Sequence, residues 1–266
     1  MERLQTRGLR PRAPYDQGGP WANYRLPSTE ELASRDIALT LDDGSTVELS
    51  FDKETLRWRG GPGATGASAT YDAVAVRPNI YFVQFLHRDN RTATSMVVNL
   101  NSGGGVLVTN SLIRGDHRTD LQQDIYSCIV TGSNGPFPQL TAELVGKRAY
   151  AEYSDDHVAE HVYFNPRRIV WQGLCKFDSS GSECDQATMW KLDDQLFLLT
   201  WVEEWEPVGA CLLLDYTAMR NVGVLFGQDD NGLVHELCGA RLRMLGEITY
   251  PAGYEPGGVA GPSMRR

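Results

Sequence analysis

Short runs of alternating apolar and polar residues dominate the chain from residue 37 onward. β-Branched and aromatic residues recur in these runs, and Gly, Asp, Asn and Pro separate them, which is typical of strands joined by turns. Asp43-Gly44 has the composition of a hairpin turn. The pattern predicts strands at 38–41, 46–51, 55–58, 71–76, 80–86, 94–100 and 105–110.

Two segments favour a helix instead. Residues 28–35, STEELASR, have Ser28 at the position of an N-cap and Glu31 three residues later, which is a capping-box pattern. Residues 119–126 have a weaker helical pattern. The Pro- and Gly-rich residues 8–27 are expected to be irregular.

The strand pattern occurs twice. Residues of the first half have identical partners 113 positions later, and beyond an insertion near residue 190 the shift becomes 116. This repetition indicates a tandem duplication of one all-β unit over 37–113 and 146–226. The identical pairs are Asp42/Asp155, Asp43/Asp156, Phe51/Phe164, Trp58/Trp171, Gly60/Gly173 and Asp72/Asp185.

Each copy has enough strands to close a small barrel, and closure removes exposed strand edges. We therefore predict an all-β protein of two tandem antiparallel β-barrels with an irregular lead and a short helix before them. The expected domains are the lead and helix at 1–36, the first barrel at 37–145, the second barrel at 146–246 and a flexible tail at 247–266.

Residues 157–161 match H-x-x-E-H, the pattern of a class of zinc peptidases that present both histidines from one helix. The 113-residue shift places this segment on a turn and a strand of the first copy, and its own composition also favours a strand. On a strand, His157 and His161 would share a face but stand about 13 Å apart, whereas two ligands of one zinc ion lie within about 4 Å. The sequence therefore predicts no metal site here.

Composition and charge narrow the class of partner. The net charge of −9 argues against nucleic acid or an anionic membrane surface as the main partner. No apolar run has the length of a transmembrane helix, and the N-terminal residues have no signal-peptide core, so we expect a cytoplasmic protein. The five cysteines form no C-x-x-C pair and are expected to be reduced.

The second copy resembles the C-terminal domain of the MoaF family, which is named for molybdenum cofactor biosynthesis, over 153–174 and 184–227. The first copy resembles the family's N-terminal domain over 40–51, 71–85 and 95–100. The resemblance covers about residues 30–240. Its most specific positions are Tyr153, Ser154, His157, Glu160, His161, Asn165, Trp171, Lys191, Leu192, Trp201, Glu203, Asp215, Arg220, Phe226 and Gly227.

This resemblance implies a lipocalin-like (calycin) β-barrel, similar to phenolic acid decarboxylases, that binds or transforms small molecules. The chain departs from the expected family pattern beside Glu203. A typical member would have Arg and Lys at the flanking positions, which hold Val202 and Glu204 here, and a Tyr where Ala159 precedes Glu160. Because positive charge is replaced by neutral or negative groups, we expect a different ligand from that of a typical relative.

Small barrels hold ligands where polar groups interrupt an apolar lining. His87 and Glu203 occupy equivalent repeat positions, each at the end of an aromatic strand face. His157, His161 and Tyr163 share one face of their segment, and Glu160 points to the other. Each of these groups has a structural alternative, as a solvated rim residue or a hydrogen-bonded core residue.

We predict His161, Glu160, Glu203 and His87 as acid–base groups. The predicted substrate-binding residues are His157, Tyr153, Tyr163, Trp171, Trp201, Tyr81 and Arg77. Arg77 could bind a carboxylate or equally be an exposed turn residue, and a role in the core is favoured over ligand stacking for Trp171. The sequence shows no G-x-G-x-x-G and no G-x-S-x-G context. Neither a metal nor a cofactor is predicted.

Three function classes follow from these observations. The first is a cofactor-independent enzyme, a lyase, isomerase or cyclase, that uses general acid–base groups on an apolar or aromatic substrate. A secondary-metabolite pathway would be a suitable context for such an enzyme. The second is a non-catalytic small-molecule carrier or an accessory protein of molybdenum cofactor biosynthesis. The third is a structural or interaction module. The predicted partner is a small molecule, and a homo-oligomer is compatible with the sequence.

Overall fold

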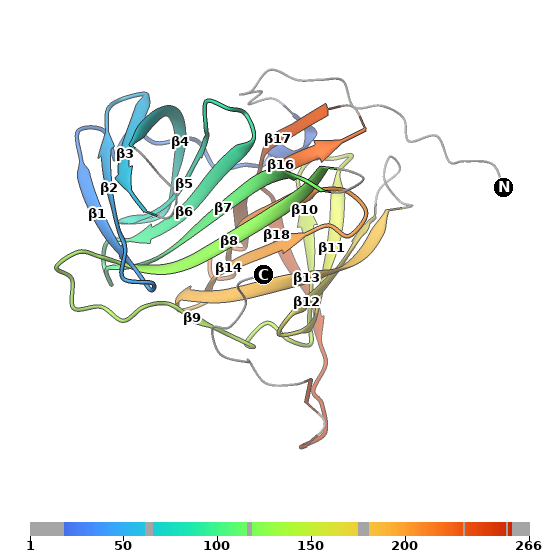
Figure 1. The fold of residues 1–266 in the computed structure, drawn as a ribbon. Coiled ribbons are helices and arrows are strands. Elements are labelled where there is room, and N and C mark those ends of the chain that lie inside the picture. Colours follow the sequence, from blue (N-terminus) through green and yellow to red (C-terminus); the bar gives the residue numbers. More distant parts are fainter. Residues whose placement is uncertain are drawn as a thin grey trace.

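The computed structural model describes residues 19–61, 66–115, 119–174, 181–230, 232–253 and 255–256. Over these residues the chain forms strands β1 to β18 and one short 3-10 helix, η1 (Pro20–Ala22). Figure 1 shows two barrels side by side, the first coloured blue to green and the second yellow to red. The predicted all-β class with two tandem barrels is therefore confirmed.

The first barrel is a closed antiparallel sheet in which each strand pairs with the next and β8 returns to β1. This is the up-and-down order of small ligand-binding barrels. Its strands are β1 (Asp36–Leu41), β2 (Thr46–Phe51), β3 (Thr55–Gly60), β4 (Ala67–Arg77), β5 (Ile80–Leu86), β6 (Thr92–Asn99), β7 (Gly104–Arg114) and β8 (Thr119–Val130).

The second barrel repeats this order, and the pairing of β12 with β13 completes its ring. The eighth strand is broken here: β17 continues the pairing with β16, and β18 pairs with β10. The strands are β10 (Lys147–Glu152), β11 (Val158–Asn165), β12 (Arg168–Gly173), β13 (Ser182–Asp193), β14 (Leu196–Val202), β15 (Val208–Asp215), β16 (Arg220–Asp229), β17 (Gly232–Cys238) and β18 (Arg241–Glu247), with β9 (Gln139–Leu140) beside β13.

Strand pairing corrects the repeat register over β11. Leu49 pairs with Trp58 in the first barrel, and His161 pairs with Trp171 in the second. His161 therefore corresponds to Leu49, at a shift of 112. A bulge after Tyr163 restores the shift of 113 because it inserts one extra residue into the strand.

The predicted partner of Phe51 is wrong for the same reason. Phe51 is buried in the first barrel, whereas Phe164 is 53% exposed. Tyr163 takes the equivalent buried position in the second barrel, opposite Ile169 as Phe51 is opposite Leu56.

The predicted helix at 28–35 is also wrong, because this segment forms turns. The Ser28 hydroxyl donates to the Asp72 carboxylate instead of capping a helix. Leu32 is buried in the core of the first barrel, so the segment covers one end of the barrel. So short a segment has little intrinsic helical stability, and burial of Leu32 decides its conformation. Residues 119–126, the weaker helical prediction, belong to β8.

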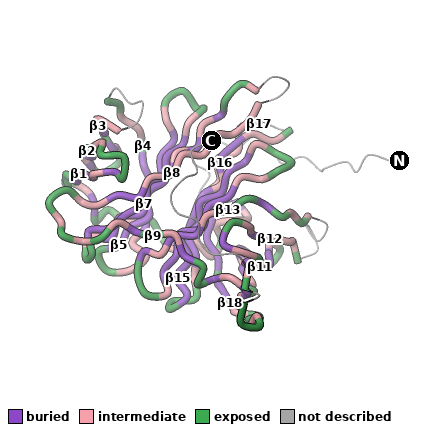
Figure 2. The backbone as a smooth tube through the Cα atoms, turned by 60° about the horizontal axis from the view of Figure 1, so that its bottom comes forward, coloured by how far each residue is buried: buried purple, intermediate pink, exposed green. Residues whose placement is uncertain are grey.

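The two barrels bury the same outer face against each other (Figure 2). Residues at the 116-residue shift pack in one apolar cluster, which includes Val74/Trp190, Ile80/Leu196, Phe82/Leu198, Val97/Leu213, Val106/Val222 and Val108/Val224. The equivalent residues Ser95 and Cys211 form a hydrogen bond across this interface. The contact therefore has approximate two-fold symmetry, like the isologous interface of a homodimer.

Arg77, predicted as a carboxylate-binding residue, joins the two barrels. Its Nε and Nη2 donate to the two carboxylate oxygens of Asp215 at 2.7 and 2.8 Å, and its Nη1 donates to the carbonyl of Asp194. Asp215 is 1% exposed. Arg77 thus binds a carboxylate of this chain, at the rim of the interface.

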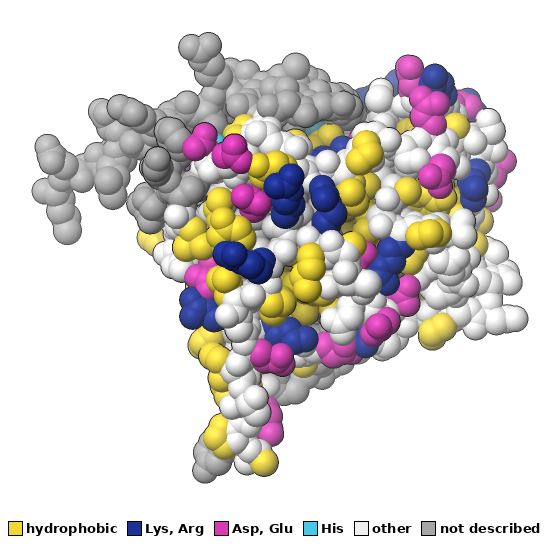
Figure 3. Space-filling view, turned by 180° about the vertical axis from the view of Figure 1, so that it is seen from behind, with side chains coloured by type: hydrophobic (Ala, Val, Ile, Leu, Met, Phe, Trp, Pro, Cys, Tyr) yellow, Lys and Arg dark blue, Asp and Glu magenta, His cyan; other side chains and the backbone are white. Residues whose placement is uncertain are grey.

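On the face drawn in Figure 3, acidic and basic side chains are interspersed and no large patch of one sign is formed. Within the described ranges, none of the helices has the length and apolar composition needed to span a membrane. Cys128, Cys211 and Cys238 are buried as free thiols, whereas Cys175 and the tail from residue 257 lie outside the described residues.

Candidate functional site

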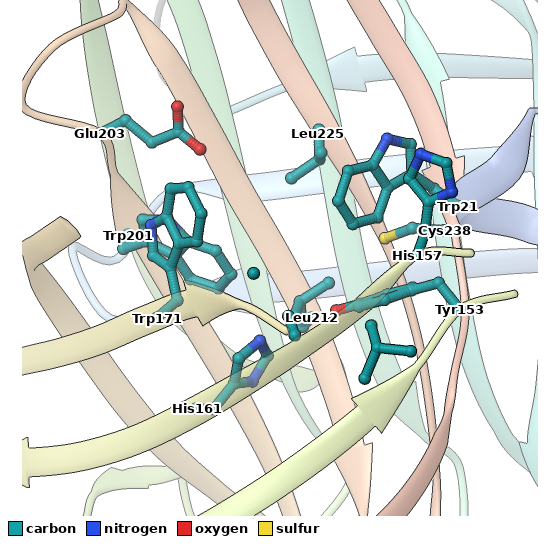
Figure 4. A pocket seen from close by; sticks show the side chains of 13 residues that line it. Trp21, Tyr153, His157, His161, Trp171, Trp201, Glu203, Leu212, Leu225 and Cys238 are labelled. Atoms are coloured by element: carbon teal, nitrogen blue, oxygen red, sulfur yellow. The ribbon is translucent and has the colours of Figure 1, made fainter. Parts of the chain in front are cut away.

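A pocket opens at one end of the second barrel, between β11, β12, β14, β15 and β16 (Figure 4). The space between its side chains is about 670 Å³, part of which is open to solvent. Most of the lining is apolar or aromatic, as is usual for small-molecule sites. Polar groups come from His157, His161, Glu203 and the indole and phenol groups of the aromatic residues.

His161 is the most unusual residue of this lining. The first barrel has the core leucine Leu49 at the equivalent position, whereas His161 places an imidazole in the wall at 2% exposure. Its Nδ1 is buried without a hydrogen-bond partner in the described structure. Burial lowers the pKa of His161 to about 4, so the imidazole is neutral at pH 7 and can accept a proton or a hydrogen bond.

Trp201 supplies a second polar atom without a partner. Its ring lies edge-on to His161, with centroids 6.0 Å apart, and its Nε1 is buried with no acceptor among the described residues. Trp171 differs, because its Nε1 donates to the Asp185 carboxylate at 3.0 Å. An unpaired buried N–H costs about 1–3 kcal/mol, so a ligand that accepts from Trp201 would remove that cost.

One carboxylate lines the mouth, and two more lie behind Trp171. Glu203 follows β14 and stands across the opening from Trp21 and His157 in Figure 4. Behind Trp171, Glu183 and Asp185 share a hydrogen bond, and burial together with the charge of Asp185 raises the pKa of Glu183 to about 7. No Lys or Arg is found in the described lining, which agrees with the loss of the two basic residues expected beside Glu203.

The cover of the pocket comes from a residue that the sequence did not suggest. Trp21, in η1, packs edge-on against Tyr153 and His157 at centroid distances of 5.1 and 5.2 Å, and its carbonyl accepts from the Gly239 N–H. The available signal was a single tryptophan within a Pro- and Gly-rich lead. The sequence also missed the lining residues Val158, Ala159, Gly173, Leu212, Leu225 and Cys238.

The pocket brings together six of the predicted residues: Tyr153, His157, His161, Trp171, Trp201 and Glu203. Glu160 lies on the opposite face of β11, where it accepts from Arg148 Nε at 2.6 Å and from Gln172. Tyr163 lies deeper, with its hydroxyl bonded to that of Tyr216. These two side chains do not line the pocket.

Besides Arg77, two predicted residues, Tyr81 and His87, belong to the first barrel. Tyr81 is fully buried, and its hydroxyl donates to Glu31 at 2.9 Å. His87 corresponds to Glu203, because its N–H bonds to Thr92 as that of Glu203 bonds to Val208. His87 lines a separate cavity of the first barrel.

The H-x-x-E-H segment has the predicted strand geometry. Residues 158–165 form β11, and Glu160 and His161 point to opposite faces. Within the described ranges, no group of three or more His, Cys, Asp or Glu side chains is arranged to hold a metal ion.

A closed antiparallel barrel with up-and-down strand order is the lipocalin-like architecture, and the chain contains two such barrels. The family model of the MoaF N-terminal domain matches residues 18–113, and that of the MoaF C-terminal domain matches residues 138–248. The chain belongs to the MoaF family.

Comparison with known proteins finds the following matches. "Protein MoaF" of Klebsiella aerogenes is 28% identical over 191 residues, which are 66% of this chain and 70% of that protein. The "Crystal Structure of a putative beta-lactamase from Burkholderia vietnamiensis" is 16% identical, with a TM-score of 0.31 over 40% of this chain and 99% of that one.

Proposed function

We propose that the second barrel binds a small ring compound that is neutral or cationic and catalyses a proton transfer on it, as in a lyase, isomerase or cyclase reaction. The observation that carries this proposal is the pair of partnerless polar atoms, His161 Nδ1 and Trp201 Nε1, in the wall of an aromatic pocket. Buried polar groups in folded proteins usually have hydrogen-bond partners. An open pocket whose wall holds two polar atoms without partners therefore favours a ligand that bonds to them.

The chemistry assigned to each residue follows from its charge state. Neutral His161 accepts a proton from the bound molecule, because its buried imidazole is uncharged at pH 7. Trp201 donates to an oxygen or nitrogen of the ligand and fixes its orientation. Glu203 stabilises positive charge that develops near the mouth. General acid–base catalysis of this kind contributes about 10²–10⁴-fold.

A non-catalytic carrier, or an accessory role in molybdenum cofactor biosynthesis, is the second candidate. Family membership and the predominantly apolar lining favour it. The two candidates differ in what happens to a bound molecule: an enzyme moves a proton of its ligand, whereas a carrier returns the ligand unchanged.

Ligand charge gives the first test of the site. We expect 2-naphthylmethylamine and 2-naphthol to bind more tightly than 2-naphthoate, by at least about tenfold, because Glu203 and the pair Glu183–Asp185 repel an anion. Calorimetric titration at low salt measures the three affinities. Tighter binding of 2-naphthoate would contradict the assigned charge preference.

Substitution with first-barrel residues separates binding from folding. His161→Leu and Trp201→Phe introduce the side chains that the first barrel has at the equivalent positions, Leu49 and Phe85. The fold is therefore expected to persist, while the affinity for the naphthyl probes falls about tenfold in each variant. Glu48→Gln, on an exposed strand face of the first barrel, is the matched control. Unchanged affinity of His161→Leu for the naphthyl probes would contradict the proposed site.

Deuterium incorporation then distinguishes an enzyme from a carrier. Metabolites that raise the thermal unfolding temperature of the protein are incubated with it in deuterated water and analysed by mass spectrometry. Conversion or deuterium uptake that is lost in His161→Leu and retained in Glu48→Gln supports catalysis. A ligand that binds with neither change identifies a carrier.

A further inference from the structure

The first barrel has a cavity of its own, in which the wall formed by β2 is apolar where the equivalent wall of the second barrel carries a histidine. The open space is about 1060 Å³, including the part open to solvent. Val47 and Leu49 form its β2 wall, where the second barrel has Ala159 and His161. Most polar groups of the first barrel lie on the opposite side, on β6, β7 and β8, and His87 and Asp89 come from the turn before β6.

Hydroxyl groups form the polar wall. Thr94 is directly opposite Thr109, and Thr92 is opposite Ser111. All four side chains line the cavity. The corresponding pairs of the second barrel are Ala210 opposite Leu225 and Val208 opposite Gly227. The duplication has therefore given one copy four aligned hydroxyls where the other has none.

An aromatic platform lies beside these hydroxyls, because Phe85 on β5 pairs with Thr94 on β6. Trp58 packs against Phe85 and His87 with centroid distances of 4.7 and 4.9 Å, and the ring of His87 stacks on that of Phe85. His87 Nε2 is 2.9 Å from the hydroxyl of Thr94. Because burial lowers the pKa of His87, the ring is neutral and its Nε2 is tied to the hydroxyl wall.

The charged groups of the cavity are carboxylates. Asp89 and Asp124 line it, and Asp124 accepts from the Gln122 amide at 2.9 Å. The described lining contains no Lys or Arg. Such a cavity repels phosphates and carboxylates, whereas hydroxyl and ammonium groups find acceptors in Asp124 and in the threonine oxygens.

We propose that the first barrel binds a neutral or cationic polyhydroxylated ring, of the kind that a monosaccharide or an amino sugar provides. The hydroxyls of such a ring exchange hydrogen bonds with Thr94, Thr109 and Asp124. Its C–H face lies on the aromatic platform, because the negative face of an aromatic ring attracts the weakly positive C–H groups. The chain then has two sites with different ligands, one in each barrel.

Ligand-observed NMR titration of the full chain tests this site with D-glucose, D-galactose, D-glucosamine and D-glucuronate. We expect saturable binding of at least one of the first three sugars, and binding of D-glucuronate at least about tenfold weaker. The double variant Thr94→Ala/Thr109→Leu, which introduces the second-barrel residues, should lower the affinity about tenfold or more. The His161→Leu variant is the control and should bind the sugars unchanged.

Asp124→Asn is a second variant, for use if the double variant fails to fold. It is expected to remove any preference for D-glucosamine over D-glucose. The proposal is overturned if none of the sugars binds saturably, if D-glucuronate binds best, or if sugar binding is lost in His161→Leu and kept in the first-barrel variants. Binding of 2-naphthylmethylamine, which tests the second barrel, should not respond to the first-barrel substitutions.

Discussion

Replacing Arg77 with methionine is expected to lower the free energy of unfolding by about 3–5 kcal/mol. The arginine donates two hydrogen bonds to Asp215, which is 1% exposed. Burial by itself raises the pKa of Asp215, but the hydrogen bonds and charge of Arg77, together with the N–H groups of Thr217 and Ala218, outweigh it and hold that pKa below its usual value. Without Arg77, a charged carboxylate stays buried at the junction of the barrels.

Urea unfolding at pH 7 measures this loss, and Arg59→Met is the matched control. Arg59 also forms an ion pair, with Glu48, but the two side chains are 78% and 54% exposed, and exposed pairs contribute about 0–1 kcal/mol. Adding Asp215→Asn to Arg77→Met should recover part of the stability because it removes the unpaired charge. Equal losses in the Arg77 and Arg59 variants would contradict a special role for the junction.

The second large effect is a pH dependence caused by His161. Its pKa is about 4 in the folded chain and about 6.5 when unfolded. Between these values the unfolded chain binds more protons than the folded chain, so the free energy of unfolding falls as the pH is lowered from 6.5 towards 4. Above pH 6.5, His161 causes no loss of stability. The difference amounts to about 3 kcal/mol.

His161→Leu isolates this contribution, because every other titrating group remains in both proteins. Urea unfolding of the wild type and of His161→Leu between pH 7 and pH 4 should show the variant gaining about 3 kcal/mol relative to the wild type as the pH falls. Parallel stability curves for the two proteins would show that His161 is not buried as a neutral base.

Alternation and repetition were sufficient to predict the class of fold. The equivalent strands β5 and β14 lie at the shift of 116 found in the sequence. Their residues are nearly all buried, since one face lines a barrel and the other joins the interface. Such two-sided burial makes a strand apolar throughout, but the sequence alone does not say what covers the second face.

Other features depend on long-range geometry that local patterns do not contain. The bulge after Tyr163 moves His161 opposite Trp171, and no turn residue marks it. Arg77 reads as an exposed turn residue, yet its partner Asp215 is 138 positions away. Trp21 reaches the pocket from a lead that has no regular pattern. Burial and pairing across the chain decide each of these positions.

The symmetric contact between the barrels has a consequence for how the two copies diverged. In a homodimer, one gene encodes both subunits, so every substitution occurs in both pockets. Once the two units are joined in one chain, each can change by itself, while the shared contact still requires apolar residues at Ile80 and Leu196 alike. The two interiors can therefore differ while the contact between them is kept, as Leu49 in one barrel and His161 at the equivalent place in the other show.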